Sequence, residues 1–182
     1  KYFMYNHTDA WHALMQKLGN EMASYLIYQI NHGAAAVQIF DSWVGALSRS
    51  DYMEFVLPHM QQMVQKVKES TDVPIILFGV NTSHLLDLFK STGVQVVGID
   101  WKTNLHWARN EVLSNDVAVQ GNLDPTLLLA DWDRLKSATK KILDENARQP
   151  GFIFNLGHGI LPSTPVENVR RVIEYVQNYP LV

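Results

Sequence analysis

Polar side chains that could bind a ligand follow apolar segments at five places in this sequence. They are Asp41 and Ser42, Asn81 and Thr82, Asp100, Gln120 with Asn122 and Asp124, and Asn155 with His158. Each apolar segment has the continuous hydrophobicity of a strand that is buried on both faces of a parallel sheet. In such sheets the carboxyl ends of the strands lie together, and ligands bind there. The pattern therefore favours a binding site rich in hydrogen-bonding groups.

Most of these residues also have a structural explanation. Asp124 precedes Pro125, which favours helix capping over catalysis, whereas Ser42 fits a turn cap as well as a ligand contact. Asp41 and Asp100 could accept hydrogen bonds from backbone N–H groups in their loops. The remaining amide side chains could pair with neighbouring backbone; these are Gln120, Asn122 and Asn155.

His158 differs from the other histidines because it lies between two glycines, where a ligand or a backbone segment can approach closely. The other histidines fall in or beside predicted helices without the spacing of a metal site, so no metal ligand is assigned. The chain has no Cys, which excludes a thiol nucleophile, a thiolate metal site and a disulfide scaffold. No nucleophile elbow is visible, so acyl-enzyme chemistry is not expected.

Composition and charge narrow the class of protein. Of the 182 residues, 47% are apolar and 18% are charged, as in an ordinary globular domain. The formal charge is −3, so the strong basic field of a nucleic-acid-binding protein is absent. No apolar run approaches the roughly 18–20 residues that span a bilayer. We therefore expect neither a nucleic-acid partner nor a membrane segment.

The elements that must position the polar residues alternate along the chain. Strands are expected at residues 35–40, 73–78, 94–99, 117–120 and 152–155. Helices are expected at residues 9–31, 50–69, 82–90, 103–113 and 131–146, and one more follows. A capping box predicts its start, with Thr164 as N-cap, Pro165 as the first helical residue and Glu167 as the third.

This order, one helix and then five strand–helix units, predicts an α/β fold with a parallel sheet and right-handed crossovers. An open doubly wound sheet and part of a (β/α)₈ barrel both fit. No Gly-x-Gly-x-x-Gly follows a strand, which weakens a dinucleotide-binding interpretation. Five strands cannot close a barrel of eight, so a barrel interpretation makes residues 1–182 a single, incomplete domain without its N-terminal strands.

Four segments together resemble the uroporphyrinogen decarboxylase family. They are GAAAVQIFDSWVGAL (residues 33–47), VQVVGIDW (94–101), VQGNLDP (119–125) and FNLGHGILP (154–162). The resemblance follows the order and spacing of the C-terminal half of that family. It implies a partial TIM barrel made of the last five βα units.

The resemblance implies cofactor-free decarboxylation of the four acetate groups of uroporphyrinogen to give coproporphyrinogen, in a cytoplasmic homodimer. Ser42 and His158 match substrate-contacting residues of the family, and Phe40 is expected to line the cleft. The family's Arg-rich loop and its pyrrole-facing Asp would lie before Lys1, so no catalytic residue is assigned. We therefore expect this chain alone to be inactive.

Two alternatives remain. One is a relative of the corrinoid-linked (methylcobamide-type) methyltransferases of the same superfamily, which bind zinc through His and Cys ligands; the absence of Cys argues against it. The other is a porphyrinogen-binding or assembly module that performs no reaction. Zinc analysis separates the first alternative from a decarboxylase. The second predicts porphyrin or partner binding without activity, and titration with coproporphyrinogen separates it from an inactive part of the enzyme.

Overall fold

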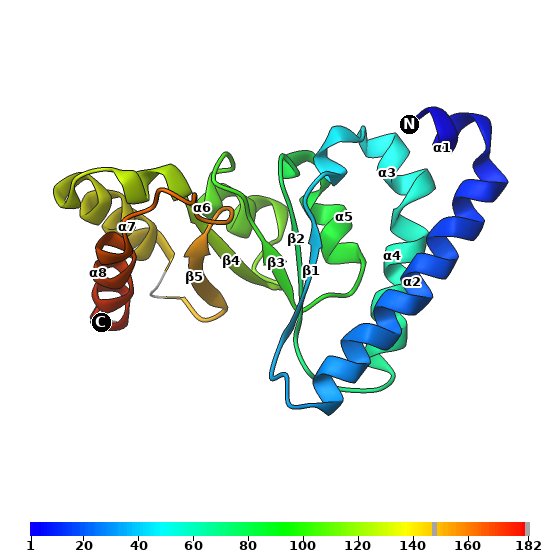
Figure 1. Cartoon of the computed structure of the whole chain (residues 1–182), viewed down its shortest axis with the longest axis horizontal. Helices are drawn as coiled ribbons and strands as arrows, with labels where there is room; N and C mark the ends of the chain where they lie inside the picture. The colour runs from blue at the N-terminus through cyan, green and yellow to red at the C-terminus, as the bar shows by residue number, and fades with distance from the viewer. Residues whose placement is uncertain (147–148, 181–182) are drawn as a thin grey trace.

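The computed structural model describes residues 1–146 and 149–180. A single parallel sheet runs through the middle of the molecule (Figure 1). Its strands, in spatial as well as chain order, are β1 (Val37–Asp41), β2 (Ile75–Gly79), β3 (Val96–Gly98), β4 (Ala118–Leu123) and β5 (Phe152–Leu156). All neighbouring pairs are parallel, so the predicted α/β class is confirmed.

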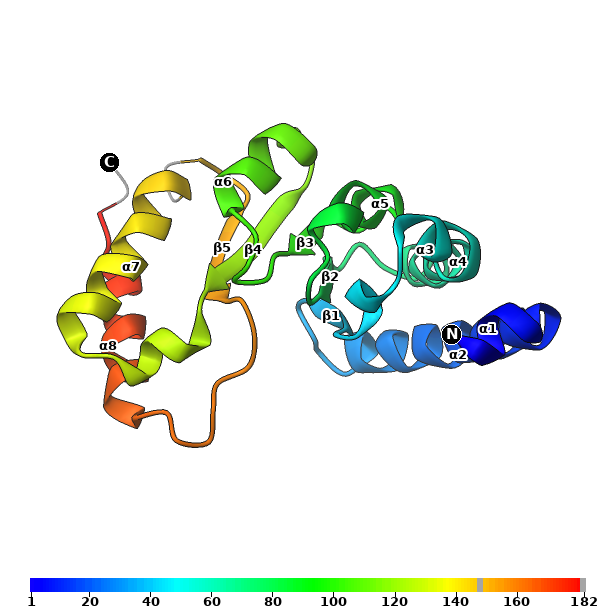
Figure 2. The same ribbon diagram turned by 90° about the horizontal axis from the view of Figure 1, so that it is seen from above.

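Helical segments connect the strands and lie around the outside of the curved sheet (Figure 2). The α-helices are α1 (Tyr2–Asn6), α2 (Thr8–Asn31), α3 (Arg49–Phe55), α4 (Leu57–Lys68), α5 (Leu86–Ser91), α6 (Leu105–Trp107), α7 (Trp132–Asn146) and α8 (Val166–Gln177). Shorter turns are η1 (Val44–Ala46), η2 (Ser83–Leu85), η3 (Ala108–Val112) and η4 (Pro125–Leu129). A strand followed by helix, repeated around a curved sheet, is the geometry of part of a TIM barrel.

The main core lies between the sheet and the helices. On this side of the central strands, Leu77, Val97 and Val119 are fully buried, and they belong to one cluster with residues of α4 and α5. Alternate residues of β2 and β3 point to the opposite, concave face and are buried too. The prediction that strands are buried on both faces is therefore confirmed for the centre of the sheet.

The same prediction is wrong at the two edges of the sheet. In β1 only Val37 is buried, and in β5 half-buried and exposed positions alternate; Phe40 is 69% exposed and Ile153 41% exposed. Both side chains lie at one level of the concave face, because the strand register links Phe40 to Phe78, Gly98, Gln120 and Ile153 in turn. An edge strand has a neighbour on one side only, so its concave-face residues have less to pack against.

The predicted helix at residues 50–69 is in fact two helices. Its N-cap is Ser48, whose hydroxyl oxygen accepts a hydrogen bond from the Asp51 N–H, and α3 ends before Val56. Pro58 then occupies the first turn of α4. Proline has no N–H and its ring clashes with the carbonyl four residues earlier, so a continuous helix through this point is excluded.

The predicted capping box of the last helix is also wrong. Pro165 is the N-cap of α8 and has an extended backbone, so the helix begins one residue later than expected. The Thr164 hydroxyl is buried and has no hydrogen-bond partner among the described residues. The predicted helix at residues 103–113 is irregular as well: Asn104 caps α6 through the Trp107 N–H, and a π-helical turn follows.

Candidate functional site

The two main predicted site residues lie at the same end of the sheet. Ser42 follows β1 and His158 follows β5, and all strands are parallel, so both residues come directly after carboxyl ends. However, β1 and β5 are the two edges of the sheet. With about 4.8 Å between neighbouring strands, the two loops start about 19 Å apart along the sheet. A ligand that contacts both residues must span the concave side of the sheet (Figure 2).

Ser42 is half-buried, and its hydroxyl has no hydrogen-bond partner among the described residues. It caps no helix, because the N-cap of η1 is Trp43 and no side chain caps that turn. The capping explanation of Ser42 is therefore wrong, and its O–H group is free to bind a ligand. Phe40, two residues earlier, exposes most of its ring on the concave face and makes an edge contact with Phe78, with ring centroids 6.1 Å apart.

His158 is exposed and lies against Trp101, which follows β3. The two rings meet edge to face, with centroids 5.7 Å apart. The ammonium group of Lys102 lies over the Trp101 ring, 5.2 Å from its centroid, and donates a 2.9 Å hydrogen bond to the Asn81 side-chain oxygen. The imidazole of the loop after β5 thus contacts the indole of the loop after β3, and the ammonium group of that same loop joins it to the loop after β2.

Lys102 is a cation at the sheet mouth that the sequence prediction missed. A polycarboxylate ligand needs cationic partners. The arginine side chains with described contacts are engaged elsewhere: Arg49 binds Asp87, Arg109 binds backbone carbonyls inside the fold, and Arg171 lies over Trp132. Arg148 lies outside the described residues. The position of Lys102, two residues past Asp100, was the available signal.

Close backbone contacts fix these loops. A Cβ atom at Gly157 would lie 2.2 Å from the Trp101 nitrogen, and one at Gly45 would lie 2.1 Å from the Val80 oxygen. Neither position can hold a side chain without movement of the neighbouring backbone. Gly157, the glycine before His158, therefore has a packing role, because its lack of a side chain lets the loop after β5 lie directly on the backbone of Trp101.

Asp100 is a structural residue, as its loop position predicted. It is buried, and its carboxylate accepts hydrogen bonds from the Asn81 N–H, the Lys102 N–H and the Thr103 hydroxyl. Asn122 donates hydrogen bonds to the carbonyls of Asp100 and Thr103, at 2.8 and 2.6 Å. These two side chains join the loops after β2, β3 and β4 and hold Lys102 in place.

The other polar residues at the strand ends also pair within the protein. Asp124 caps η4 by accepting a hydrogen bond from the Thr126 N–H, and Asn155 accepts one from the Leu156 N–H, so both local predictions are confirmed. Gln120 differs from expectation: it donates to the Gln38 side chain rather than to backbone, at 3.2 Å. That contact joins β4 to β1 across the concave face.

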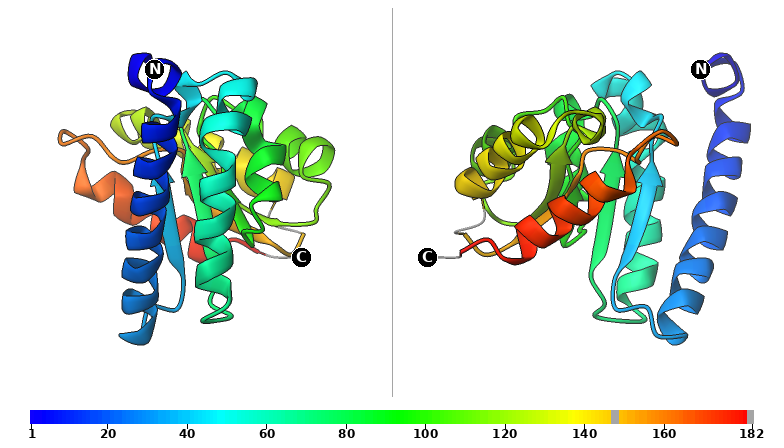
Figure 3. Two further views of the ribbon diagram at one scale, coloured as in Figure 1. Left: turned by 90° about the vertical axis from the view of Figure 1, so that its right-hand side faces the viewer. Right: turned by 60° about the vertical axis from the view of Figure 1, so that its left-hand side comes forward.

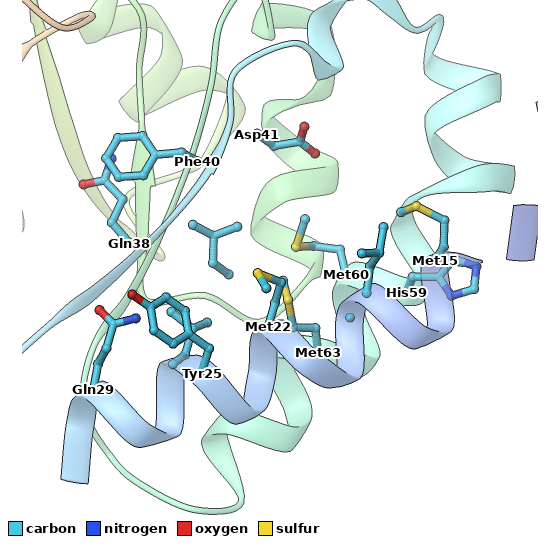
Figure 4. A pocket seen from close by; sticks show the side chains of 14 residues that line it. Met15, Met22, Tyr25, Gln29, Gln38, Phe40, Asp41, His59, Met60 and Met63 are labelled. Atoms are coloured by element: carbon cyan, nitrogen blue, oxygen red, sulfur yellow. The ribbon is translucent and has the colours of Figure 1, made fainter. Parts of the chain in front are cut away.

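Asp41 ends β1 and lies at the top of a cavity between the sheet, α2 and α4 (Figure 4). No described group donates a hydrogen bond to its carboxylate, so the predicted pairing with loop backbone is wrong. Burial raises the pKa of Asp41 from 3.8 to about 6. Burial, together with the charge of Asp41, also raises the pKa of Tyr52, whose buried hydroxyl has no hydrogen-bond partner within residues 1–146 and 149–180.

The described part of the chain has neither a metal-binding cluster nor a helix that could cross a membrane. Residues 1–146 and 149–180 contain no cluster of three or more His, Cys, Asp or Glu side chains that could hold a metal ion. Within the same ranges, no helix has the length and hydrophobicity needed to cross a membrane.

Known proteins resemble the chain over nearly its whole length. The family model "Uroporphyrinogen decarboxylase (URO-D)" matches residues 1–179. The uroporphyrinogen decarboxylase of Koribacter versatilis is 46% identical and that of Thermus thermophilus 49% identical; the matches cover 98% and 97% of this chain, and 51% of each relative. A methyltransferase structure from Methanosarcina mazei superposes with a TM-score of 0.83 at 21% identity, over 98% of this chain and 52% of that one, which supports the fold alone.

This chain therefore spans about half the length of the curated relatives it matches, and it belongs to the uroporphyrinogen decarboxylase family.

Proposed function

We propose that this chain carries part of the substrate site of a uroporphyrinogen decarboxylase, a carboxy-lyase of porphyrin and haem biosynthesis. Membership of the family over residues 1–179 supports the reaction. The observation that carries the site is the position of Ser42, Lys102 and His158 at one end of the sheet, with their polar groups accessible. These three side chains can all donate hydrogen bonds, which is what an anionic substrate requires.

In this proposal the named residues bind and orient the substrate. The Ser42 hydroxyl, the Lys102 ammonium group and the His158 imidazole bind acetate or propionate carboxylates of the porphyrinogen. Phe40 and Trp101 offer aromatic surface to the pyrrole rings. Holding the scissile bond in one orientation contributes to catalysis by itself. No proton transfer is assigned to these side chains.

The reaction balances without a cofactor. In each step the bond between the acetate methylene and its carboxylate breaks and CO₂ leaves. The electron pair moves into the pyrrole ring, which has been protonated beforehand. The methylene carbon then takes up a proton and becomes a methyl group, and the ring releases the proton that it had gained, so each CO₂ released consumes one proton overall. The substrate is thus its own electron sink.

The proposal includes the architecture of the whole enzyme. Residues 1–182 are one incomplete domain and supply five of the eight βα units of a barrel. Further cationic side chains and the pyrrole-binding carboxylate come from polypeptide outside these residues, and the complete enzyme works as a homodimer in the cytoplasm. The purified 182-residue chain is accordingly inactive, and turnover of uroporphyrinogen to coproporphyrinogen by this chain alone would contradict that assignment.

Binding of the porphyrinogen tests the site. We expect Ser42→Ala, Lys102→Ala and His158→Ala each to weaken binding of anaerobically prepared uroporphyrinogen by about tenfold, because each removes a hydrogen bond to a charged group. Lys66→Ala, a surface change on α4, is the control and should bind as wild type does. Absence of binding, or equal binding by all four variants, would contradict the site. Stoichiometric zinc in the purified protein would favour a methyltransferase relative.

A further inference from the structure

Lys102 carries a positive charge at the carboxyl end of the sheet that no described carboxylate neutralises. Four other cationic side chains, those of Lys1, Arg49, Lys90 and Lys140, each form an ion pair with an aspartate. Within residues 1–146 and 149–180, no carboxylate forms such a pair with Lys102, whose side chain is exposed. Its ammonium group is therefore held by something other than an opposite charge.

The acid closest to Lys102 along the chain is Asp100, and its carboxylate is used for another purpose. It is buried and accepts hydrogen bonds from the N–H groups of Asn81 and Lys102 and from the Thr103 hydroxyl. All three donors are uncharged. Asp100 therefore fixes the backbone of the loop, and the ammonium group takes a different partner.

The partner of the ammonium group is a side-chain amide. Lys102 Nζ donates a 2.9 Å hydrogen bond to the Asn81 side-chain oxygen, and it lies over the Trp101 ring. An amide oxygen carries no net charge, and an ammonium group has three N–H donors. Asn81 therefore holds Lys102 in place, leaves its charge uncompensated and uses one of its three donors.

The backbone of Asn81 is itself held from two sides. Its φ of 59° is left-handed, a conformation that Asn adopts more readily than most residues. Its N–H donates to the Asp100 carboxylate. On the other side, a Cβ atom at Gly45 would lie 2.6 Å from the Asn81 carbonyl oxygen, so the loop after β1 packs directly on it. Asn81 is thus a fixed support for the ammonium group.

A carboxylate is the ligand that suits this arrangement. An uncompensated ammonium group forms short, charge-assisted hydrogen bonds to carboxylate oxygens. His158 contacts the same indole ring of Trp101, with 5.7 Å between the ring centroids, and adds a second nitrogen that can donate. Both views of Figure 3 show the loops after β1 and β5 toward one end of the sheet, the end at which Lys102 follows β3.

We propose that Asn81 is a positioning residue, whose side chain fixes the Lys102 ammonium group beside Trp101 as an uncompensated cation that accepts one carboxylate of an anionic ligand. We call these three residues the carboxylate subsite. The identity of the ligand, a porphyrinogen, rests on the proposed function. The subsite itself rests on the contacts of Asn81 and on the absence of an ion pair among the described residues.

Asn81→Asp separates this role from a merely structural one. The two side chains have the same shape, and Asp keeps an oxygen that accepts from Lys102, so a structural role predicts unchanged behaviour. In our proposal the new carboxylate neutralises Lys102, and uroporphyrinogen binding should fall at least about tenfold. Asn20→Asp is the matched control, because Asn20 lies 3.5 Å from Lys66 Nζ, away from the strand ends. It adds the same charge beside a lysine and should bind as wild type does.

Asn81→Gly tests the hydrogen bond that holds the ammonium group. Glycine keeps the left-handed backbone and removes the amide. The Trp101 ring current displaces the proton NMR signals of the Lys102 side chain, and in Asn81→Gly these signals should move toward those of a solvated lysine. Ser114→Gly, at a second left-handed position with φ of 56°, should leave them unchanged. Loss of the signals in Lys102→Arg identifies them.

A simpler anion tests the subsite without the porphyrinogen. In a titration with benzenehexacarboxylate, the Lys102 signals of the wild-type chain should shift at concentrations that leave those of Lys66 unchanged. In Asn81→Asp they should shift at least about tenfold less readily. The hexacarboxylate is a suitable probe because it offers carboxylates on an aromatic ring and has no reactive acetate group.

Three results would overturn the proposal. The hexacarboxylate could fail to shift the Lys102 signals, it could shift them equally in Asn81→Asp and in the wild type, or Asn81→Gly could leave them at their wild-type positions. A different result concerns the proposed function alone: if the hexacarboxylate binds at Lys102 and the chain does not bind uroporphyrinogen, the substrate assignment fails and the carboxylate subsite stands.

Discussion

At the scale of single residues, the loop after β5 depends on the absence of a side chain at Gly157. Its Cβ position lies 2.2 Å from the Trp101 nitrogen, in backbone that cannot rotate away. We expect Gly157→Ala to lower the free energy of unfolding by about 2–3 kcal/mol, the usual range for overpacking. Gly159→Ala is the matched control, because no atom of the described residues lies within 4 Å of its Cβ position. Urea denaturation measures both, and equal stability of the two variants would contradict the close contact.

The carboxylate of Asp41 should make the stability of the fold depend on pH. Its pKa is raised to about 6 in the fold, so its contribution to stability is fully present below about pH 4 and is lost as pH rises through 6. Asp41→Asn removes the buried charge and should raise the free energy of unfolding at pH 8 by on the order of 2 kcal/mol. At pH 4 the variant and the wild type should be nearly equal.

Urea midpoints across this pH range provide the measurement. Glu21→Gln on the exposed surface of α2 is the control, and it should leave the difference between pH 4 and pH 8 unchanged. An Asp41→Asn variant that is less stable than wild type at pH 8 would mean that the carboxylate has a favourable partner in solution.

At the scale of elements, two histidines join α2 to α4. His12 Nδ1 and His59 Nε2 are 2.8 Å apart, and His12 also stacks on Phe55. One nitrogen of this pair must donate and the other must accept, so both rings cannot be protonated at once. Burial, and then the charge of His12, lower the pKa of His59 below its usual 6.5. Its contribution to stability is therefore present above pH 6.5 and is lost as pH falls through the lowered pKa.

We expect protonation of the His12–His59 pair at acid pH to weaken the contact between α2 and α4. The measurement is the urea midpoint between pH 7.5 and pH 5, made in the Asp41→Asn background because Asp41 changes stability in the opposite direction. His59→Phe should flatten the profile, whereas His106→Phe on α6 should leave it as in wild type. If the profile stays unchanged in His59→Phe, the histidine pair does not control it.

The elements that could be predicted from sequence are those with strong local signals. Hydrophobic runs and turn residues predict the order of strands and helices, the cap at Asp124 and the parallel arrangement of the sheet. The break at Val56 was missed because the apolar periodicity continues through Pro58. The predicted start of α8 is one residue too early, because the residue type of Thr164 favours an N-cap, whereas the N-cap in the structure is Pro165. Local pattern alone does not decide between neighbouring caps.

The site was predictable only in part. Ser42 and His158 were placed at one end of the sheet because parallel strands require it, and their role in substrate binding stays a prediction. Their separation across the sheet depends on strand order, which sequence pattern does not specify. Lys102 was missed because its importance comes from contacts with Trp101 and Asn81, which lie on two different loops.

At the scale of the whole molecule, the sheet is buried on both faces only at its centre. The difference in burial between the centre and the edge of the sheet can be measured by making the same substitution, Ile→Ala, at one position in each. Ile76 in β2 and Ile153 in β5 both point to the concave face, at 8% and 41% exposure. Their side chains are identical, so a difference in stability between the two alanine variants reports how well the surrounding sheet covers each position.

We expect Ile76→Ala to lower the free energy of unfolding by about 2–4 kcal/mol, as for a core position that cannot collapse. Ile153→Ala should cost less than about 1 kcal/mol, because its side chain is already partly in water. Exposed Phe40 and Ile153 should also let the chain bind the dye ANS, since large apolar patches are otherwise rare on a monomer. If Ile153→Ala costs as much as Ile76→Ala, and ANS does not bind, then a second chain covers the concave face in solution. The open sheet would in that case be the wrong description of the protein on its own.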